Sequence, residues 1–157
     1  MRQITLNLDG SYRRPVAVLQ NGLRAMLDTG AFIPVWTDNE EILVKMMGAK
    51  FLQSNVPISG FGGTTYGNLY QVTLNIGDLI FPNMPIVANN ELDPPFNMIL
   101  SATMFSGLIY EVDTVNNVLN INVPDAESFI RNLTFDNGKG GRIVLCTTQD
   151  NPSQIKI

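Results

Sequence analysis

The sequence predicts a mainly β protein of one domain, 1–157, with one or two short helices. Apolar and polar residues alternate over 4–8 and again over 70–76, which is the period of half-buried strands. An Asn-Gly pair at 21–22 is the strongest short signal for a tight hairpin between two strands. These patterns favour antiparallel strands joined by short turns.

The first strands are expected to present an acidic residue. Residues 4–8 form the first strand, and 14–20 form the second. After the Asn-Gly turn, the strand 23–27 returns and carries Asp28 at its tip. Two antiparallel strands would therefore support this carboxylate on a rigid base.

One helix is expected after the first strands. Thr37 is predicted as its N-cap, with Glu40 reaching back in a capping box, and Gly48 as its end. Four apolar residues at helical spacing are expected to pack in the core: Ile42, Leu43, Met46 and Met47.

Residues 51–68 are rich in glycine and small polar groups. They lack the Gly-Lys-Ser/Thr of a phosphate loop, so a hairpin with a tip at Gly60, Phe61, Gly62 and Gly63 is expected. Composition alone leaves a mobile flap and an ordinary exposed hairpin equally open. A strand over 70–76 follows.

The second half is expected to consist of short elements. Four prolines indicate short extended edge segments, namely Pro82, Pro85, Pro94 and Pro95. Residues 97–100 form an apolar run, and Ser101 is predicted to cap a short helix through Phe105. Strands are expected over 108–112 and 118–123, with Asp113 in the solvated turn between them.

The C-terminal segment, 124–157, is expected to extend the domain. Asp125 is predicted to cap a short helix that runs through Arg131. A glycine-rich loop follows at 136–141, and a strand is predicted over 142–146.

Composition excludes several kinds of chemistry. The chain has no histidine and one cysteine, so a His-based triad, an intrachain disulfide and a Cys/His zinc site are excluded. No metal or other cofactor is expected. The net charge is −4 without a basic cluster, so nucleic acid is an unexpected partner. No apolar run approaches membrane-spanning length, and the expected compartment is cytoplasmic.

Asp28 occupies a position, directly after an apolar strand, where a charged residue is unusual. It follows the apolar run 25–27, and aspartate is depleted in strands and almost never fully buried without a partner. Thr29 adds a hydroxyl beside it, and Gly30 permits a sharp turn or a close approach. An ordinary Asp-Thr-Gly turn is the alternative interpretation.

Three segments together resemble retropepsin-like aspartic proteases. The motif at 27–31, Leu-Asp-Thr-Gly-Ala, resembles their active-site motif, and 58–63 resembles their glycine-rich flap. Residues 98–101 resemble their apolar-apolar-Gly element, with Ser101 where glycine is usual. The resemblance covers about 4–123 and implies a closed β-barrel of the acid-protease fold. It gives no role to 124–157.

The resemblance also implies roles for individual residues. Asp28 would be catalytic, Thr29 would lock two active-site loops across an interface, and Gly30 would give substrate access to the backbone. Aspartic-protease chemistry needs two carboxylates sharing a proton. With one motif per chain, the second Asp28 would come from a second copy in a homodimer. Substrate-binding positions would be Ala31, Phe32, Ile33, Gly60, Phe61, Gly62, Gly63, Phe96 and Met98.

The sequence supports three functions. The first is a homodimeric aspartic endopeptidase that cleaves a peptide or protein substrate. The second is an inactive dimer of the same fold that binds extended peptides, because fold alone does not establish activity. The third is another hydrolase that pairs Asp28 with Glu111 or Asp113 of the same chain.

Overall fold

The fold is mainly β, as the sequence predicts, and its strands form two sheets. The computed structural model describes residues 2–12, 14–19, 21–28, 31, 33–60, 63–77, 79–89, 96–105, 108–123, 130–136 and 142–149. The strands are β1 (Arg2–Asn7), β2 (Val16–Val18), β3 (Arg24–Asp28), β4 (Val35–Trp36), β5 (Lys50–Gly60), β6 (Gly63–Ile76), β7 (Leu79–Ala88), β8 (Met98–Ser101), β9 (Ile109–Asp113), β10 (Val118–Val123), β11 (Ile130–Asp136) and β12 (Arg142–Gln149). The helices are α1 (Glu40–Met47) and the 3₁₀ helix η2 (Ala102–Phe105).

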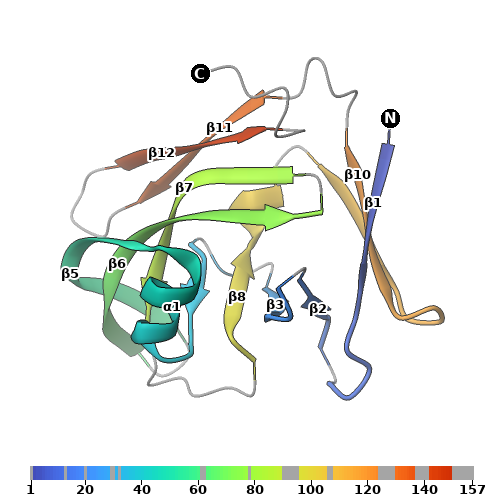
Figure 1. Cartoon of the computed structure of the whole chain (residues 1–157), viewed down its shortest axis with the longest axis horizontal. Helices are drawn as coiled ribbons and strands as arrows, with labels where there is room; N and C mark the ends of the chain where they lie inside the picture. Colours follow the sequence, from blue (N-terminus) through green and yellow to red (C-terminus); the bar gives the residue numbers. More distant parts are fainter. Residues whose placement is uncertain are drawn as a thin grey trace.

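The large sheet places β8 between β3 and β4. Its strand order is β11-β12-β7-β4-β8-β3-β2, with β6 and then β5 branching from β7 (Figure 1). β8 runs parallel to β3 and antiparallel to β4. Because β3 and β8 are parallel, their carboxyl ends lie at the same end of the sheet.

The small sheet, β1-β10-β9, covers the other side of the core (Figure 1). Ile4 and Leu6 of β1 and Leu119 and Ile121 of β10 are buried, whereas the alternate residues face outward. On the outer face the Thr5 hydroxyl donates to Asn120 Oδ1 at 2.8 Å. Among the described strands, no pairing closes either sheet into the expected barrel, since β2 and β11 end the large sheet as edges.

The N-cap of helix α1 lies two residues after the predicted one. Asn39, not Thr37, is the N-cap, because its side-chain oxygen accepts from the backbone N–H of Glu41 at 2.7 Å. The Thr37 hydroxyl is already engaged, since it donates to the carbonyl oxygen of Phe96 at 2.8 Å. The expectation for Thr37 was therefore wrong, and a contact distant in sequence is the reason.

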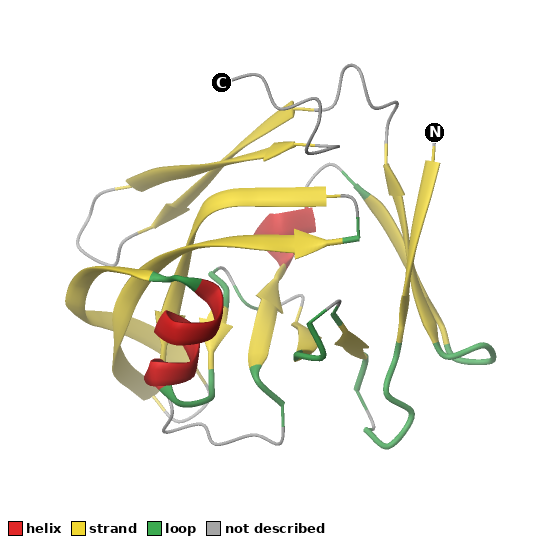
Figure 2. Ribbon diagram, viewed as in Figure 1, coloured by secondary structure: helices red, strands yellow, loops and turns green. Residues whose placement is uncertain are grey.

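The helix α1, the longer of the two red ribbons in Figure 2, packs against the core through one face. Leu43 is fully buried and Met47 is partly buried one turn later, but Met46 is 59% exposed. Ile42 also packs against the core, so the core positions expected for Ile42, Leu43 and Met47 are confirmed; the one expected for Met46 is wrong because it lies off the face that these three share. Gly48 ends the helix with φ of 64°, as predicted. Neither described helix has the length and apolar character needed to span a membrane.

The proline-containing segment forms one long buried strand, β7, instead of short edge pieces. Val72 pairs with Met84 and Leu74 pairs with Phe81, so Pro82 and Asn83 face one residue of β6 in a β-bulge. Asn83 has a φ of 54° there. The bulge explains how Pro82 is accommodated inside a sheet. Pro94 and Pro95 lie outside the described residues.

The C-terminal segment contributes two strands. The predicted strand over 142–146 is confirmed within β12, which pairs with β11 and, at Gln149, with Ile80 of β7. The predicted helix is wrong at its end, because Arg131 lies in β11. Its start at Asp125 and most of the glycine-rich loop lie outside the described residues. Backbone pairing outweighs the local helix signal at 130–131.

Gly67 brings the β5–β6 hairpin close to the end of β7, and a side chain there has no room. A Cβ would clash with the carbonyl oxygen of Ala88 and lie 2.6 Å from Val87 Cγ1. We expect Gly67→Ala to destabilise the fold by about 2–3 kcal/mol. Urea unfolding followed by the fluorescence of the buried Trp36 measures this loss.

The matched control is Gly10→Ala. Its Cβ would lie 3.7 Å from Asn117 Nδ2, an ordinary contact, so a change within about 0.5 kcal/mol is expected. Equal losses in the two variants would contradict the role of Gly67 as a close-approach position.

Candidate active site

Asp28 lies at the carboxyl end of β3, where the chain leaves the core. The three residues before it, 25–27, are buried, whereas Asp28 is half-buried. Its carbonyl oxygen accepts from the backbone N–H of Ala31 at 3.1 Å, which closes a tight turn. The carboxylate is thus held on a rigid strand yet reaches the surface. Thr29, Gly30 and Phe32 lie outside the described residues.

The loop after Asp28 contacts the base of the β5–β6 hairpin. Ile33 is half-buried and packs against a small cluster formed by Val56, Leu69 and Val87. These residues come from β5, β6 and β7. Ala31 is also half-buried. The predicted positions Ala31 and Ile33 therefore lie on the same loop as Asp28, and Ile33 joins this loop to the hairpin.

The glycine-rich segment forms the tip of a long hairpin. Gly60 pairs with Gly63, so only 61–62 connect β5 and β6. Phe61 and Gly62 themselves lie outside the described residues. Register shifts between Phe51 and Val56, with a φ of 56° at Asn55, bend β5 below the tip. The hairpin expected from the glycines is confirmed, and its mobility stays a prediction.

Two predicted substrate-binding residues are not brought together with Asp28. Met98 pairs with Ala25 and is fully buried in the core. Phe96 precedes β8 and packs edge-on against Tyr12, with ring centroids 6.2 Å apart. Both lie toward the amino end of β8, about 10 Å or more from the level of Asp28 at the strand rise. Both residues are apolar, as a substrate-binding role would require, but the contacts seen here are with residues of the same chain.

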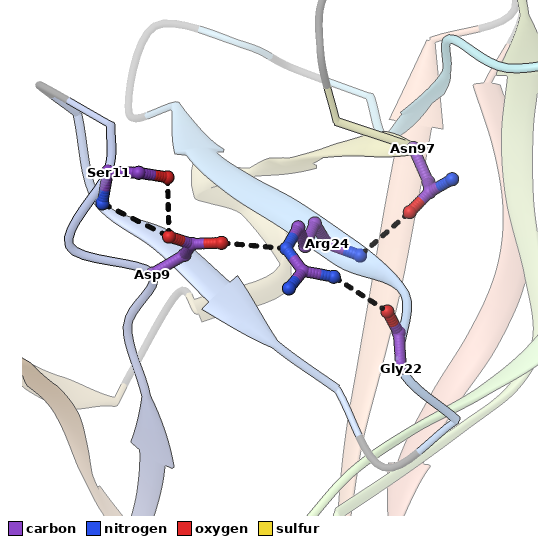
Figure 3. A network of polar contacts seen from close by, with 5 residues as sticks. All are labelled: Asp9, Ser11, Gly22, Arg24 and Asn97. Atoms are coloured by element: carbon purple, nitrogen blue, oxygen red, sulfur yellow. Dashed lines mark hydrogen bonds and ion pairs between the residues drawn. The ribbon is translucent and has the colours of Figure 1, made fainter.

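Asn97 joins the beginnings of β3 and β8 (Figure 3), a role that no local sequence pattern indicated. The side-chain oxygen of Asn97 accepts from the backbone N–H of Arg24 at 2.8 Å, and the backbone N–H of Asn97 donates to the Arg24 carbonyl oxygen at 2.9 Å. Its side-chain nitrogen donates to Asp38 Oδ2 at 2.8 Å. Asn97 thereby fixes the register in which Asp28 meets Ser101.

The side chain of Arg24 extends the same network to the end of the first strand (Figure 3). Arg24 Nε lies 2.8 Å from Asp9 Oδ2, and the Ser11 hydroxyl and backbone N–H donate to Asp9 Oδ1. The hydrogen bond from Arg24, and then those from Ser11, lower the pKa of Asp9 to about 2. The charge pair ties the chain before β2 to β3.

Ser101 is the residue at the level of Asp28 on the neighbouring strand. The two are register partners in the parallel β3–β8 pair. Ser101 is fully buried, and its hydroxyl has no hydrogen-bond partner among the residues that the structure describes. Leaving a buried hydroxyl unpaired costs about 1–3 kcal/mol. The predicted N-cap role is therefore not fulfilled by this side chain, although the short helix η2 follows it.

The alternative carboxylates belong to the small sheet. Glu111 is exposed on β9, and Asn120 Nδ2 donates to it at 3.3 Å. Asp113 accepts from the backbone N–H groups of Val115 and Asn116, and the Asn116 backbone hydrogen bond lowers its pKa. Asp113 is the last residue of β9, and its carboxylate accepts from the turn that follows, so the turn is confirmed but starts one residue later than predicted. Strand pairing places neither carboxylate beside Asp28.

Other features of the surface do not add to this site. A hollow of about 230 Å³ lies elsewhere and is lined by Asn21, Met46, Met47, Thr73, Leu74 and Asn75. Within the described part of the chain, no three acidic, cysteine or histidine residues gather where they could hold a metal ion. Comparison with protein-family models, curated proteins and solved structures finds no match.

The Asp9–Arg24 pair gives stability a pH dependence of defined sign. Because the pKa of Asp9 is lowered from 3.8 to about 2, its stabilising contribution is present above pH 3.8 and is lost as the pH falls toward 2. Asp9→Asn should therefore lower the urea midpoint at pH 7, and the two proteins should converge near pH 2. Urea titrations across this pH range test the expectation.

Glu41→Gln is the control for loss of a carboxylate. Glu41 lies 4.0 Å from Lys45 in an exposed i, i+4 pair, so its loss should change the midpoint little at any pH. A constant difference between Asp9→Asn and the wild type down to pH 2 would argue against the ion pair as its cause.

Proposed function

We propose that the protein is a homodimeric aspartic endopeptidase of the retropepsin type, with a retropepsin-like fold. The observation that carries the proposal is the position of Asp28. This carboxylate is half-buried at the carboxyl end of β3, beside the parallel strand β8, and directly precedes Thr29, Gly30 and Ala31. A rigid strand end that presents one carboxylate suits a catalytic group that must be held accurately.

The second carboxylate comes from a second copy of the chain. The strands that flank β3 supply none, because β2 is Val-Ala-Val and β8 is Met-Ile-Leu-Ser. A twofold axis near Asp28 brings the two symmetry-related carboxylates together. Two like charges about 3 Å apart cannot both ionise cheaply, so the pair shares one proton. Thr29 of each chain locks the two loops across this interface.

Because one proton is shared, one Asp28 carboxylate acts as the general base and the other as the general acid. The ionised Asp28 accepts a proton from a water molecule as the water oxygen attacks the peptide carbonyl carbon. The neutral Asp28 donates its proton to the carbonyl oxygen, which gives a tetrahedral diol. Collapse of the diol breaks the C–N bond, and the proton held by the first carboxylate moves to the departing nitrogen. The second carboxylate, ionised since it gave up its proton, takes a proton from one diol hydroxyl as that oxygen becomes the carbonyl oxygen of the new carboxylic acid. The pair then carries one proton again.

The substrate class follows from the residues around Asp28. An extended peptide lies between the active-site loops and the hairpin tip at Gly60 and Gly63, held by backbone hydrogen bonds in the manner of an added strand. Ala31 and Ile33 are apolar, and Phe32 and Phe61 add aromatic rings in sequence. The cleft therefore favours apolar residues on both sides of the scissile bond.

An inactive dimer that binds extended peptides is the second candidate. The buried hydroxyl of Ser101 favours it, because the resemblance places glycine at this point beside the catalytic residue. A side chain there alters packing directly behind Asp28. This candidate shares the hairpin and the dimer and differs only in the chemical step.

Asp28→Asn distinguishes these candidates. The substitution removes both ionisable groups of the pair, so cleavage of a denatured-protein mixture should fall by about 10³-fold or more while the dimer persists. Mass spectrometry of the products and sedimentation of the protein measure the two properties. The wild-type rate should follow a bell-shaped pH profile on the acid side of neutrality.

The matched control is Glu111→Gln, which removes an exposed carboxylate and should retain full activity. Cleavage by a folded Asp28→Asn dimer would refute the mechanism, and a monomeric wild type would refute the shared site. Tight peptide binding without cleavage by the wild type would select the inactive dimer.

The hairpin tip should respond to substrate. If Gly60 and Gly63 close over a bound peptide, hydrogen exchange in 58–65 should slow when a pepstatin-like inhibitor binds. The backbone amides of β10 are the internal control, because this strand is paired on both sides and should exchange equally slowly in both states. Unchanged exchange at the tip would identify an ordinary hairpin.

A further inference from the structure

We propose that Ser101 is a positioning residue for Asp28, with its hydroxyl donating a hydrogen bond to the Asp28 carboxylate in the working form of the site. The catalytic consequence rests on the proposed protease function, whereas the hydrogen bond does not. The inference starts from two facts: Ser101 is fully buried, and its hydroxyl has no partner among the described residues.

The strand pairing sets the distance between the two side chains. Asp28 and Ser101 are register partners on parallel strands, so their side chains lie on the same face of the sheet. Neighbouring strands lie about 4.8 Å apart. A carboxylate and a hydroxyl attached at that spacing come within hydrogen-bond distance after rotation about the Cα–Cβ bond of serine.

The burial of Ser101 limits which groups can accept a hydrogen bond from its hydroxyl. A second chain cannot reach the Ser101 hydroxyl without rearrangement, because its accessible surface is zero. The other residues of β8 are Met98, Ile99 and Leu100, and the facing strand β4 is Val-Trp, so these two strands offer no side-chain acceptor. The Asp28 carboxylate is the acceptor that register places on the same face at the same level.

The strands that flank β3, and the described residues of the loop after Asp28, are uncharged. β2 and β8 carry no charged residue, and the loop positions Ala31 and Ile33 are apolar. The carbonyl oxygen of Pro15 accepts from the backbone N–H of Leu27, which places the preceding residue, Arg14, near the end of β3. Arg14 is exposed, and its Nη1 lies 3.9 Å from Met26 Sδ. In the dimer the partner subunit's Asp28 is the remaining charge. These charges are the same in the wild type and in the Ser101 variants, so they do not contribute to a difference between their Asp28 titrations.

The hydrogen bond has a predictable effect. A hydrogen-bond donor stabilises the ionised form of a carboxylate relative to its neutral form. Removing the Ser101 hydroxyl should therefore move the Asp28 signal to higher pH in a titration, and with it the acid limb of the activity profile if the protein cleaves peptides. The glycine of the resembled motif also lacks the hydroxyl, so Ser101→Gly should act as Ser101→Ala does.

Carbon-13 NMR titration of the aspartate carboxyl groups tests the inference directly, in the full chain. We expect the midpoint of the Asp28 signal to rise by about one pH unit in both Ser101→Ala and Ser101→Gly. The signal is assigned by its absence from Asp28→Asn. Two variants are needed because they differ in the volume they leave but share the loss of the hydroxyl, so equal shifts identify the hydroxyl as the cause.

Ser11→Ala is the matched control. It removes a hydroxyl that donates to Asp9, so it should raise the midpoint of Asp9 and leave that of Asp28 unchanged. An unchanged Asp28 midpoint in both Ser101 variants, or a shift in only one of them, would overturn the inference.

The pH dependence of kcat/KM separates this inference from the proposed function. If the protein cleaves peptides, the acid limb should move upward in the two Ser101 variants together with the lower of the two NMR titration steps of the Asp28 pair. A shifted NMR midpoint in a protein that cleaves nothing would reject the protease proposal and support the hydrogen bond. An unmoved acid limb in an active enzyme would reject the positioning role.

Discussion

The candidate site depends on the parallel pairing of β3 with β8. This pairing sets Asp28 beside Ser101 and aligns the carboxyl ends of both strands. Parallel neighbours cannot be joined by a tight turn, so something other than a hairpin must fix their register. Asn97 does this by binding both backbone polar groups of Arg24 at the opposite end of the pair. One residue, through its side chain and its backbone N–H, therefore helps to determine which residue lies next to the carboxylate.

The surroundings of this pair explain why its register can be rigid. Residues 25–27 are buried, and Met98 and Leu100 fill the core without exposed surface. A one-residue slip would move these side chains to the wrong face and separate Asn97 from Arg24. The polar network at one end and the apolar core along the strands thus favour the same register. At the far end, where the chain turns, Asp28 is half-buried and partly exposed to solvent.

Sequence patterns succeeded where short-range chemistry decides the structure. Alternation identified β1 and the second half of β6, glycine located the end of α1 and the hairpin tip, and a turn was correctly expected between β9 and β10. The sequence patterns were misleading where contacts with residues distant in the sequence decide the structure. Thr37 looked like a cap but donates to Phe96, and Met46 fits the helical spacing yet lies off the contact stripe. The prolines of β7 looked like edge markers, but a bulge admits one of them to a buried strand.

The sequence by itself determined the chemistry that is possible. Without histidine, and with one aspartate set between an apolar run and Thr-Gly-Ala, it directed attention to Asp28. Only the tertiary structure decided the neighbours of that carboxylate. It separated Phe96 and Met98 from Asp28, brought Ser101 beside it, and made Asn97 the residue that fixes them. The physical reason is distance along the chain: Arg24 and Asn97 are 73 positions apart, and no local pattern encodes a contact between them.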